Sequence, residues 1–125
     1  MRTTLAFCFF FLLSPHANAE TLQESFDKAR LLYTQRGTTQ EENEKKALVT
    51  FQQIAAKGHL GGKFYLGEIY ETGRAGKAID MKVAEGHYRA AALGCYDYAL
   101  HVLRTSFLVP EKDMPTIPAL QALAH

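Results

Sequence analysis

The chain resembles itself at an interval of 36 residues, and this interval limits the folds that it can adopt. The run Ile-Ala-Ala-Lys-Gly at 54–58 is echoed by Ala-Ala-Ala-Leu-Gly at 90–94, and the same offset relates Leu66 to Val102. A repeat of this length is one unit of paired elements, which cannot bury its apolar face alone and therefore stacks on the next copy. The interval thus predicts a short array of stacked units.

Apolar residues in the chain after residue 20 recur almost throughout at helical spacing. The sequence predicts five helices, with apolar stripes at 22–33, 47–55, 62–70, 83–91 and 99–107. No stretch alternates between apolar and polar residues as a strand would. Most links are short, the 73–79 loop excepted, and short links make neighbouring helices antiparallel. We therefore expect an all-α chain of antiparallel helix hairpins.

The expected helix ends carry recognisable capping residues. Thr21 with Glu24 forms a capping box, and Thr39 with Glu42 repeats it. Asp80 is a good N-cap for the fourth helix. Glycines that suit helix ends are Gly37, Gly58, Gly73 and Gly94.

The run Leu66-Gly67-x-x-Tyr70-x-x-Gly73 within 58–74 resembles the first helix of a Sel-1-like repeat, a relative of the tetratricopeptide repeat. Residues 84–94 resemble its second helix. The resemblance covers one full repeat, about 58–94, with partial repeats on both sides, and it implies a short right-handed α-solenoid. The matching positions are Gly58, Leu66, Gly67, Tyr70, Gly73, Ala84, Ala91 and Gly94.

The repeat also predicts how its helices pack. Gly67 lies inside a helix, where glycine is unfavourable, so we expect a close approach of the partner helix there. Leu66 and Tyr70 should fill the seam. Gly86 and His87 stand where the family has large aromatic residues, so this helix is either loose or filled by tail residues. The candidate fillers are Ile117, Leu120 and Leu123.

Residues 1–19 have the features of a cleavable signal peptide. Arg2 precedes an apolar run of about nine residues, and the segment ends on Ala17-Asn18-Ala19. A membrane-spanning helix needs roughly 20 apolar residues, so no stable membrane insertion is expected. The expected order is a signal peptide, a repeat domain over 20–109 and a proline-containing tail or cap over 110–125. Export would place the protein in a Gram-negative periplasm or outside the cell.

Charge and cysteine content exclude other classes. The chain has 14 basic and 13 acidic residues, which is not the basic excess that nucleic-acid binding requires. Cys95 would be the single thiol after cleavage. We expect Cys95 to be a small buried core residue; the alternative is an intermolecular disulfide, as in a homodimer, or a redox role.

The sequence contains no motif that points to catalysis, a metal or a cofactor. His59 and His87 belong to no zinc-binding spacing. His59 follows a helix-ending glycine and is expected to satisfy terminal carbonyls, and His87 is expected to be a partly buried packing residue. The glycines and cations of 73–77 are expected to form a hairpin turn, because the loop lacks the strand and Gly-Lys-Ser/Thr ending of a phosphate cradle.

The resemblance implies that the first helices of the hairpins line a concave face that binds other proteins. On that basis we expect Phe64, Glu68, Glu71 and Arg104 to line a shared groove, flanked by Tyr65 and Tyr96. The expected function is a non-catalytic exported adaptor for a protein or peptide. Two alternatives remain: a cell-envelope enzyme of the branch linked to β-lactams and peptidoglycan, whose paired cysteines this chain lacks, or a secreted effector that binds a host protein.

Overall fold

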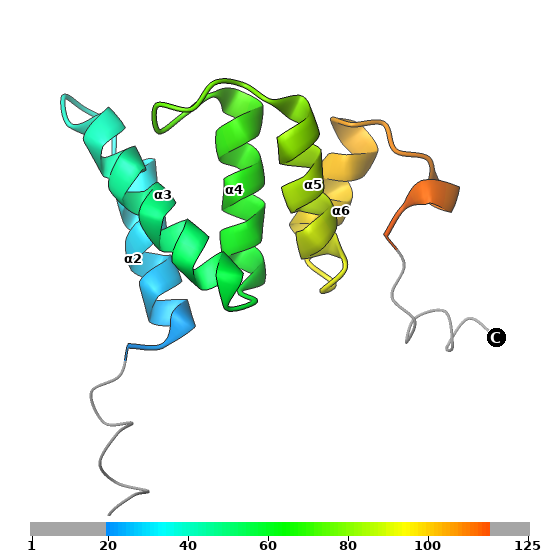
Figure 1. Ribbon diagram of the computed structural model, residues 1–125, viewed down its shortest axis with the longest axis horizontal. Helices are drawn as coiled ribbons and strands as arrows, with labels where there is room; N and C mark the ends of the chain where they lie inside the picture. Colours follow the sequence, from blue (N-terminus) through cyan, green and yellow to red (C-terminus); the bar gives the residue numbers. More distant parts are fainter. Residues whose placement is uncertain (1–19, 116–125) are drawn as a thin grey trace, which may run out of the picture.

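The computed structural model describes residues 20–115 and is all-helical over that range, as the apolar periodicity predicts (Figure 1). Each of the five predicted stripes lies on a helix, except that the last one extends to Phe107, two residues beyond the end of the helix at Thr105, and these residues contain no strand. A single 3₁₀ turn follows the last helix. The helices are α2 (Leu22–Thr34), α3 (Gln40–Ala56), α4 (Leu60–Thr72), α5 (Met81–Ala92) and α6 (Asp97–Thr105), and the turn is η1 (Glu111–Asp113).

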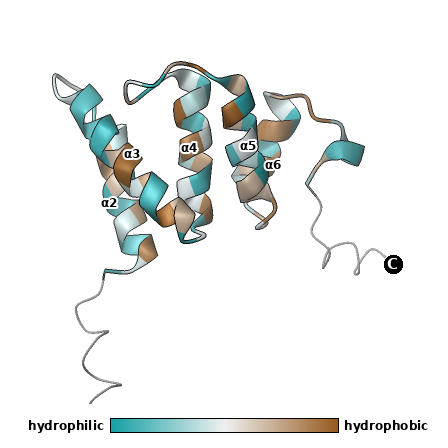
Figure 2. Ribbon diagram, viewed as in Figure 1, coloured by the Kyte–Doolittle hydropathy of each residue, from teal (hydrophilic) through white to brown (hydrophobic). Residues whose placement is uncertain are grey.

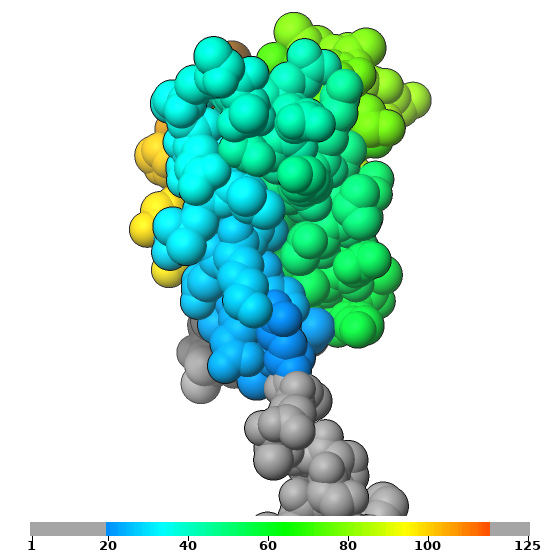
Figure 3. Space-filling model, turned by 90° about the vertical axis from the view of Figure 1, so that its left-hand side faces the viewer, coloured from blue at the N-terminus to red at the C-terminus, as the bar shows by residue number. Residues whose placement is uncertain are grey.

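Each helix packs mainly against the next helix along the chain. Successive helices run in opposite directions, so that α2 and α3 form one hairpin and α4 and α5 the next (Figure 1). In Figure 1, α2 lies behind α3 and α6 lies behind α5. The end view in Figure 3 agrees, because α6 appears on the same side of the molecule as α2. The helices α2 and α6 therefore lie on the same side of the molecule.

Two of the three predicted N-caps are confirmed. Thr21 and Glu24 form the reciprocal capping box, and the Asp80 carboxylate accepts a hydrogen bond from the Val83 N–H at 3.1 Å. The box predicted at Thr39 is wrong, because the Thr39 hydroxyl makes no capping bond. That hydroxyl accepts instead from the side-chain amide of Asn43, one turn into the helix.

Of the four glycines predicted at helix ends, two end helices in the predicted way, whereas Gly94 does not and Gly37 lies two residues beyond Gln35, the C-cap of α2. Gly58 and Gly73 adopt positive φ values of 93° and 69°, which favour glycine. After α5, the left-handed position falls on Cys95 (φ 69°) and not on Gly94. Gly94 serves packing, because a Cβ atom there would collide with the side chain of Leu60.

The core consists of two clusters. Figure 2 shows hydrophobic and hydrophilic residues interspersed along the helices, as expected for helices with one buried face. One joins α2, α3 and α4, with Leu66 and Ile69 contributed by α4. The other joins α5, α6 and the segment after α6, whose Met114 is buried. The buried members of the first cluster are Phe26, Ala29, Tyr33, Ala47, Leu48, Phe51, Ile54, Leu66, Ile69 and Ala75, and those of the second are Ala84, Tyr88, Ala91, Ala92, Ala99, Leu103 and Met114.

Three glycines of α4 let neighbouring side chains pack against its backbone. A Cβ atom at Gly67 would lie 2.8 Å from ring carbons of Tyr88, so the expected close approach is made by an aromatic ring of α5. The equivalent distances are 2.7 Å from Gly61 to Phe26 and from Gly62 to Ile54. These glycines allow α4 to pack closely against α2, α3 and α5.

The face of α5 around Gly86 differs from the prediction. His87 is half-buried and stacks on the half-buried Tyr70, with ring centroids 5.7 Å apart, which confirms its packing role. Gly86 has open space around it, and Val83, expected to point inward, is 39% exposed. The proposed fillers from the tail lie outside the described residues.

Cys95 is exposed, so the expectation that it is a buried core residue is wrong. The helical stripe of α5 ends at Ala92, and Cys95 belongs to the turn that follows. In this turn its backbone is left-handed. The thiol is therefore accessible to other molecules.

Candidate partner-binding surface

A continuous set of aromatic contacts leads from the core to the surface. Tyr65 of α4 stacks on the buried Phe51 at 4.9 Å between ring centroids and packs edge-on against its neighbour Phe64. Phe64 in turn contacts Tyr96 at 5.3 Å and Tyr98 at 6.2 Å. Tyr98 is 69% exposed. The molecule thus presents aromatic rings to solvent at the start of α6.

Charged groups of α2 and α4 lie on the same face as these rings. Burial raises the pKa of the Tyr65 hydroxyl; the nearby Glu68 raises it further, whereas Arg30 of α2 lowers it. Arg30 also acts on the pKa of Tyr96. We call this surface the first-helix face and define it by Arg30 of α2, by Phe64, Tyr65 and Glu68 of α4, and by Tyr96 and Tyr98 at the start of α6.

Glu68 is a half-buried carboxylate on this face. Burial raises its pKa above the ordinary value, an effect that Glu71 adds to and Arg74 and Arg36 oppose. Within residues 20–115 the carboxylate has no hydrogen bond or ion pair; only its backbone carbonyl is engaged, by the Thr72 hydroxyl. A partly desolvated charge without a partner is costly.

An apolar groove of about 550 Å³ adjoins this face. Its walls come from the start of α2, the α3–α4 turn and the start of α6, and they include Leu22, Phe26, His59, Leu60, Gly61 and Tyr96. Phe26 lies 5.6 Å from Tyr65 between ring centroids, so the groove continues into the aromatic rings. The groove and the first-helix face can therefore be contacted by one ligand.

His59 on the groove wall has the predicted role and a second one. Its backbone N–H donates to the Ile54 carbonyl at the end of α3 at 3.0 Å, as expected, and its ring Nδ1 accepts a hydrogen bond from the Gly62 N–H at 3.1 Å, so it also caps the start of α4. Its Nε2 lies 3.1 Å from the side-chain oxygen of Gln23. Burial lowers the pKa of His59. A neutral ring suits this capping role.

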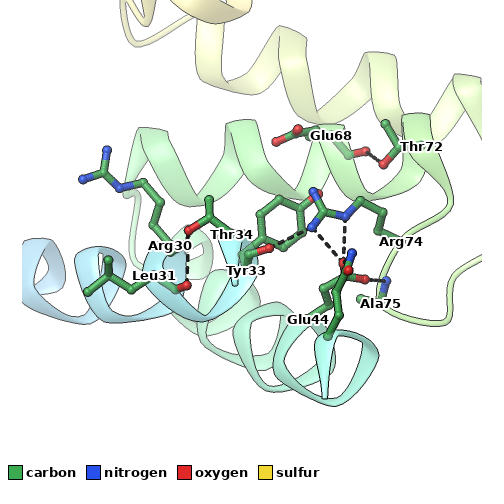
Figure 4. Close-up of polar contacts among 10 residues, drawn as sticks. Arg30, Leu31, Tyr33, Thr34, Glu44, Glu68, Thr72, Arg74 and Ala75 are labelled. Atoms are coloured by element: carbon green, nitrogen blue, oxygen red, sulfur yellow. Dashed lines mark hydrogen bonds and ion pairs between the residues drawn. The ribbon is translucent and has the colours of Figure 1, made fainter. Parts of the chain in front are cut away.

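A second cavity, of about 740 Å³, lies between the α2–α3 and α4–α5 loops, and a buried ion pair stands on its wall (Figure 4). The Arg74 guanidinium donates to the Glu44 carboxylate at 2.7 Å and 2.9 Å and to the Tyr33 carbonyl at 2.7 Å. It also lies over the Tyr33 ring, 3.8 Å from the centroid. Arg74 thus ties the α4–α5 loop to the first hairpin.

The other oxygen of Glu44 also has a donor, the backbone N–H of Ala75 at 3.1 Å. Burial alone would raise the pKa of Glu44, but the hydrogen bonds from Gln40, Ala75 and Arg74 outweigh it and lower the pKa. The burial of Glu44 was not predicted from the sequence. The signal was its position, because Glu44 precedes Ala47 and Leu48 by three and four residues and so lies on the buried stripe.

The structure divides the predicted site residues into two groups. Phe64 and Glu68 lie together on the first-helix face. Glu71 and Arg104 already have partners within the chain: Glu71 accepts from the Tyr88 hydroxyl at 2.5 Å, and Arg104 pairs with Glu111 of η1 at 2.5 Å. The 73–77 segment forms a turn between helices, as predicted, with Ala75 buried in the core.

Residues 20–115 contain no group of three or more His, Cys, Asp or Glu side chains arranged to hold a metal ion. Over the same range, no helix combines the length and apolar character needed to cross a membrane. Comparisons of the chain with models of protein families, with curated proteins and with solved structures found no match.

Proposed function

We propose that the protein is an exported helical-repeat adaptor that binds a protein or peptide on its first-helix face without catalysing a reaction. The observation that carries the proposal is the aromatic cluster of the half-buried Phe64 and Tyr96 and the exposed Tyr98 beside an apolar groove. Aromatic residues are enriched among those that dominate binding energies. A large exposed apolar patch beside polar groups is typical of an interaction site.

The repeat resemblance supports the same proposal. A right-handed α-solenoid of Sel-1-like repeats would place α2, α4 and α6 on its inner face. Five antiparallel helices with α2 and α6 on one side of the molecule are consistent with this arrangement (Figures 1 and 3). The 36-residue interval of the sequence is thus consistent with a single binding face.

Site-specific photo-crosslinking in the native host tests the proposed face. A photoreactive benzoylphenylalanine replaces Tyr98 in one variant and Val49 of α3 in the other, since both positions are well exposed (69% and 52%). We expect a discrete crosslinked partner from position 98 and none from position 49. Equal crosslinking at both positions, or none at either, would contradict the proposed face.

Export is tested separately, because residues 1–19 lie outside the described range. We expect intact-mass analysis of the protein from its native host to show a chain that begins at Glu20, recovered from the periplasm or the medium. A cytoplasmic protein that retains residues 1–19 would contradict export and leave the binding face untouched.

A further inference from the structure

The geometry points to the partner's chemistry: the first-helix face binds a peptide segment that places a lysine or arginine side chain on Glu68 and an adjacent apolar side chain in the groove. This inference rests on the proposed function and names the ligand class that the face accepts. Its starting point is the half-buried Glu68 carboxylate, which has no hydrogen bond or ion pair within residues 20–115.

Charge complementarity favours a cation at this position. An ammonium or guanidinium group would supply the donors that the Glu68 carboxylate lacks. An acidic ligand would instead meet repulsion from Glu68 and from the nearby Glu71, which also raises the Glu68 pKa. A purely apolar ligand would desolvate the carboxylate further without compensating it.

The neighbours of Glu68 also suit a cationic side chain. The charge of Glu68 raises the pKa of the hydroxyls of Tyr33, Tyr65 and Tyr88, and of these three rings the half-buried Tyr65 is the one that a ligand can reach, since Tyr33 and Tyr88 are buried. Aromatic rings attract lysine and arginine head groups through their faces. Tyr33 additionally has a fully buried hydroxyl that lacks a hydrogen-bond partner in the described range. The polar groups at this place are therefore incompletely satisfied within the chain.

The arginines around the first-helix face leave Glu68 available, because neither Arg74 nor Arg36, whose charges lower the Glu68 pKa, bonds to its carboxylate within residues 20–115. Arg74 is held by Glu44 and by the Tyr33 carbonyl, as Figure 4 shows. Arg30 lies over the Phe26 ring and pairs with Asp27 at 3.8 Å. A ligand's cation would thus meet a carboxylate that these side chains do not neutralise by direct contact.

The apolar part of the ligand has its own site. Phe64 precedes Glu68 by one helical turn, and Tyr65 links Glu68 to Phe26 on the groove wall. A peptide that crosses the face can therefore engage the carboxylate with one side chain and the groove of about 550 Å³ with a neighbour. The expected ligand combines Lys or Arg with an aromatic or aliphatic residue close by.

Selection from a phage-displayed library of random dodecapeptides tests this ligand class. The baits are the purified protein, Glu68→Gln and the matched control Glu42→Gln, whose carboxylate is exposed in the first turn of α3. We expect the wild type and Glu42→Gln to enrich Lys or Arg next to apolar residues, and Glu68→Gln to lose the cationic preference. Circular dichroism confirms that Glu68→Gln folds, as the absence of a carboxylate partner leads us to expect.

Calorimetric titration of one enriched peptide then measures the contact itself. Replacing its arginine by citrulline, or its lysine by acetyl-lysine, should weaken wild-type binding by about tenfold to a hundredfold. The Glu68→Gln protein should show the same loss with the parent peptide and little further loss with the neutral one. Enriched peptides without a cationic preference, or equal losses in all three proteins, overturn this inference and leave the proposed function standing. Failure of the wild type to enrich any peptide overturns both.

Discussion

Two glycines inside helices allow the packing of α4 on α5 to be tested against a built-in control. Gly67 and Gly86 both occupy helix interiors, where alanine is more stable than glycine by about 1 kcal/mol. At Gly86 the added methyl group meets nothing within 4 Å. Gly86→Ala should therefore stabilise the protein by about 1 kcal/mol, which for a domain of this size raises Tm by about 4–8 °C.

At Gly67 the same methyl group would lie 2.8 Å from two ring carbons of Tyr88. That ring is held by Phe64 and Phe107 on either side and by the hydrogen bond from its hydroxyl to Glu71, so it cannot turn away. Overpacking typically costs about 1–3 kcal/mol, which offsets or exceeds the gain in helix propensity. Gly67→Ala should thus be less stable than Gly86→Ala by about 1–3 kcal/mol.

Thermal and urea unfolding followed by circular dichroism compare the two variants with the wild type. A larger residue, Gly67→Leu, should extend the loss to a few kcal/mol, whereas exposed Gly86 should tolerate the same change far better. Equal increases in Tm for Gly67→Ala and Gly86→Ala would refute the packing described for α4 and α5.

The remaining predictions concern charge and the exposed thiol. Glu44→Gln should lower the free energy of unfolding by about 3 kcal/mol, because it leaves the Arg74 guanidinium partly buried without its carboxylate. Because the pKa of Glu44 is lowered, its carboxylate contributes to the free energy of unfolding above pH 4.5, and this contribution is lost as the pH falls below 4.5. Urea titrations should therefore show that acid destabilises Glu44→Gln less than the wild type. The raised pKa of Glu68 gives the opposite dependence of stability on pH. Its contribution to the free energy of unfolding is present at low pH and is lost as the pH rises through the folded pKa. Glu68→Gln should therefore raise Tm at pH 7 and not at pH 4. Cys95 should react with an alkylating reagent in the folded protein nearly as fast as a free thiol; labelling that requires denaturant would contradict its exposure.

Helical periodicity was sufficient to predict where the helices lie, because each stripe is buried against a chain neighbour. Local rules failed where a tertiary contact took over a residue's polar atoms or its space. Gly94 was taken for a turn residue although its role is to make room for Leu60, and no pattern within one helix signals this contact. Thr39 is a local exception, because its hydroxyl bonds to Asn43 of the same helix and not to the backbone.

The site was predictable only in part for the same reason. Phe64 and Glu68 follow from the face of a first helix, which the repeat interval defines. The partners of Glu71 and Arg104 lie 17 and 7 residues further along the chain, on a tyrosine and on a glutamate that no spacing connects to them. Arg74 is similar, because its bond to Glu44 joins the α4–α5 loop to α3, 30 residues earlier in the chain.

Packing mainly between consecutive helices has a consequence for how the molecule forms and opens. Pairing neighbours in sequence requires little loop closure, so folding should be rapid and can begin at either hairpin. Amide exchange should then be fastest near the outermost turns of α2 and α6 and slowest in α4, which has a packed neighbour on each side. The helix that contributes Glu68 would thus remain formed while the ends of the array fray.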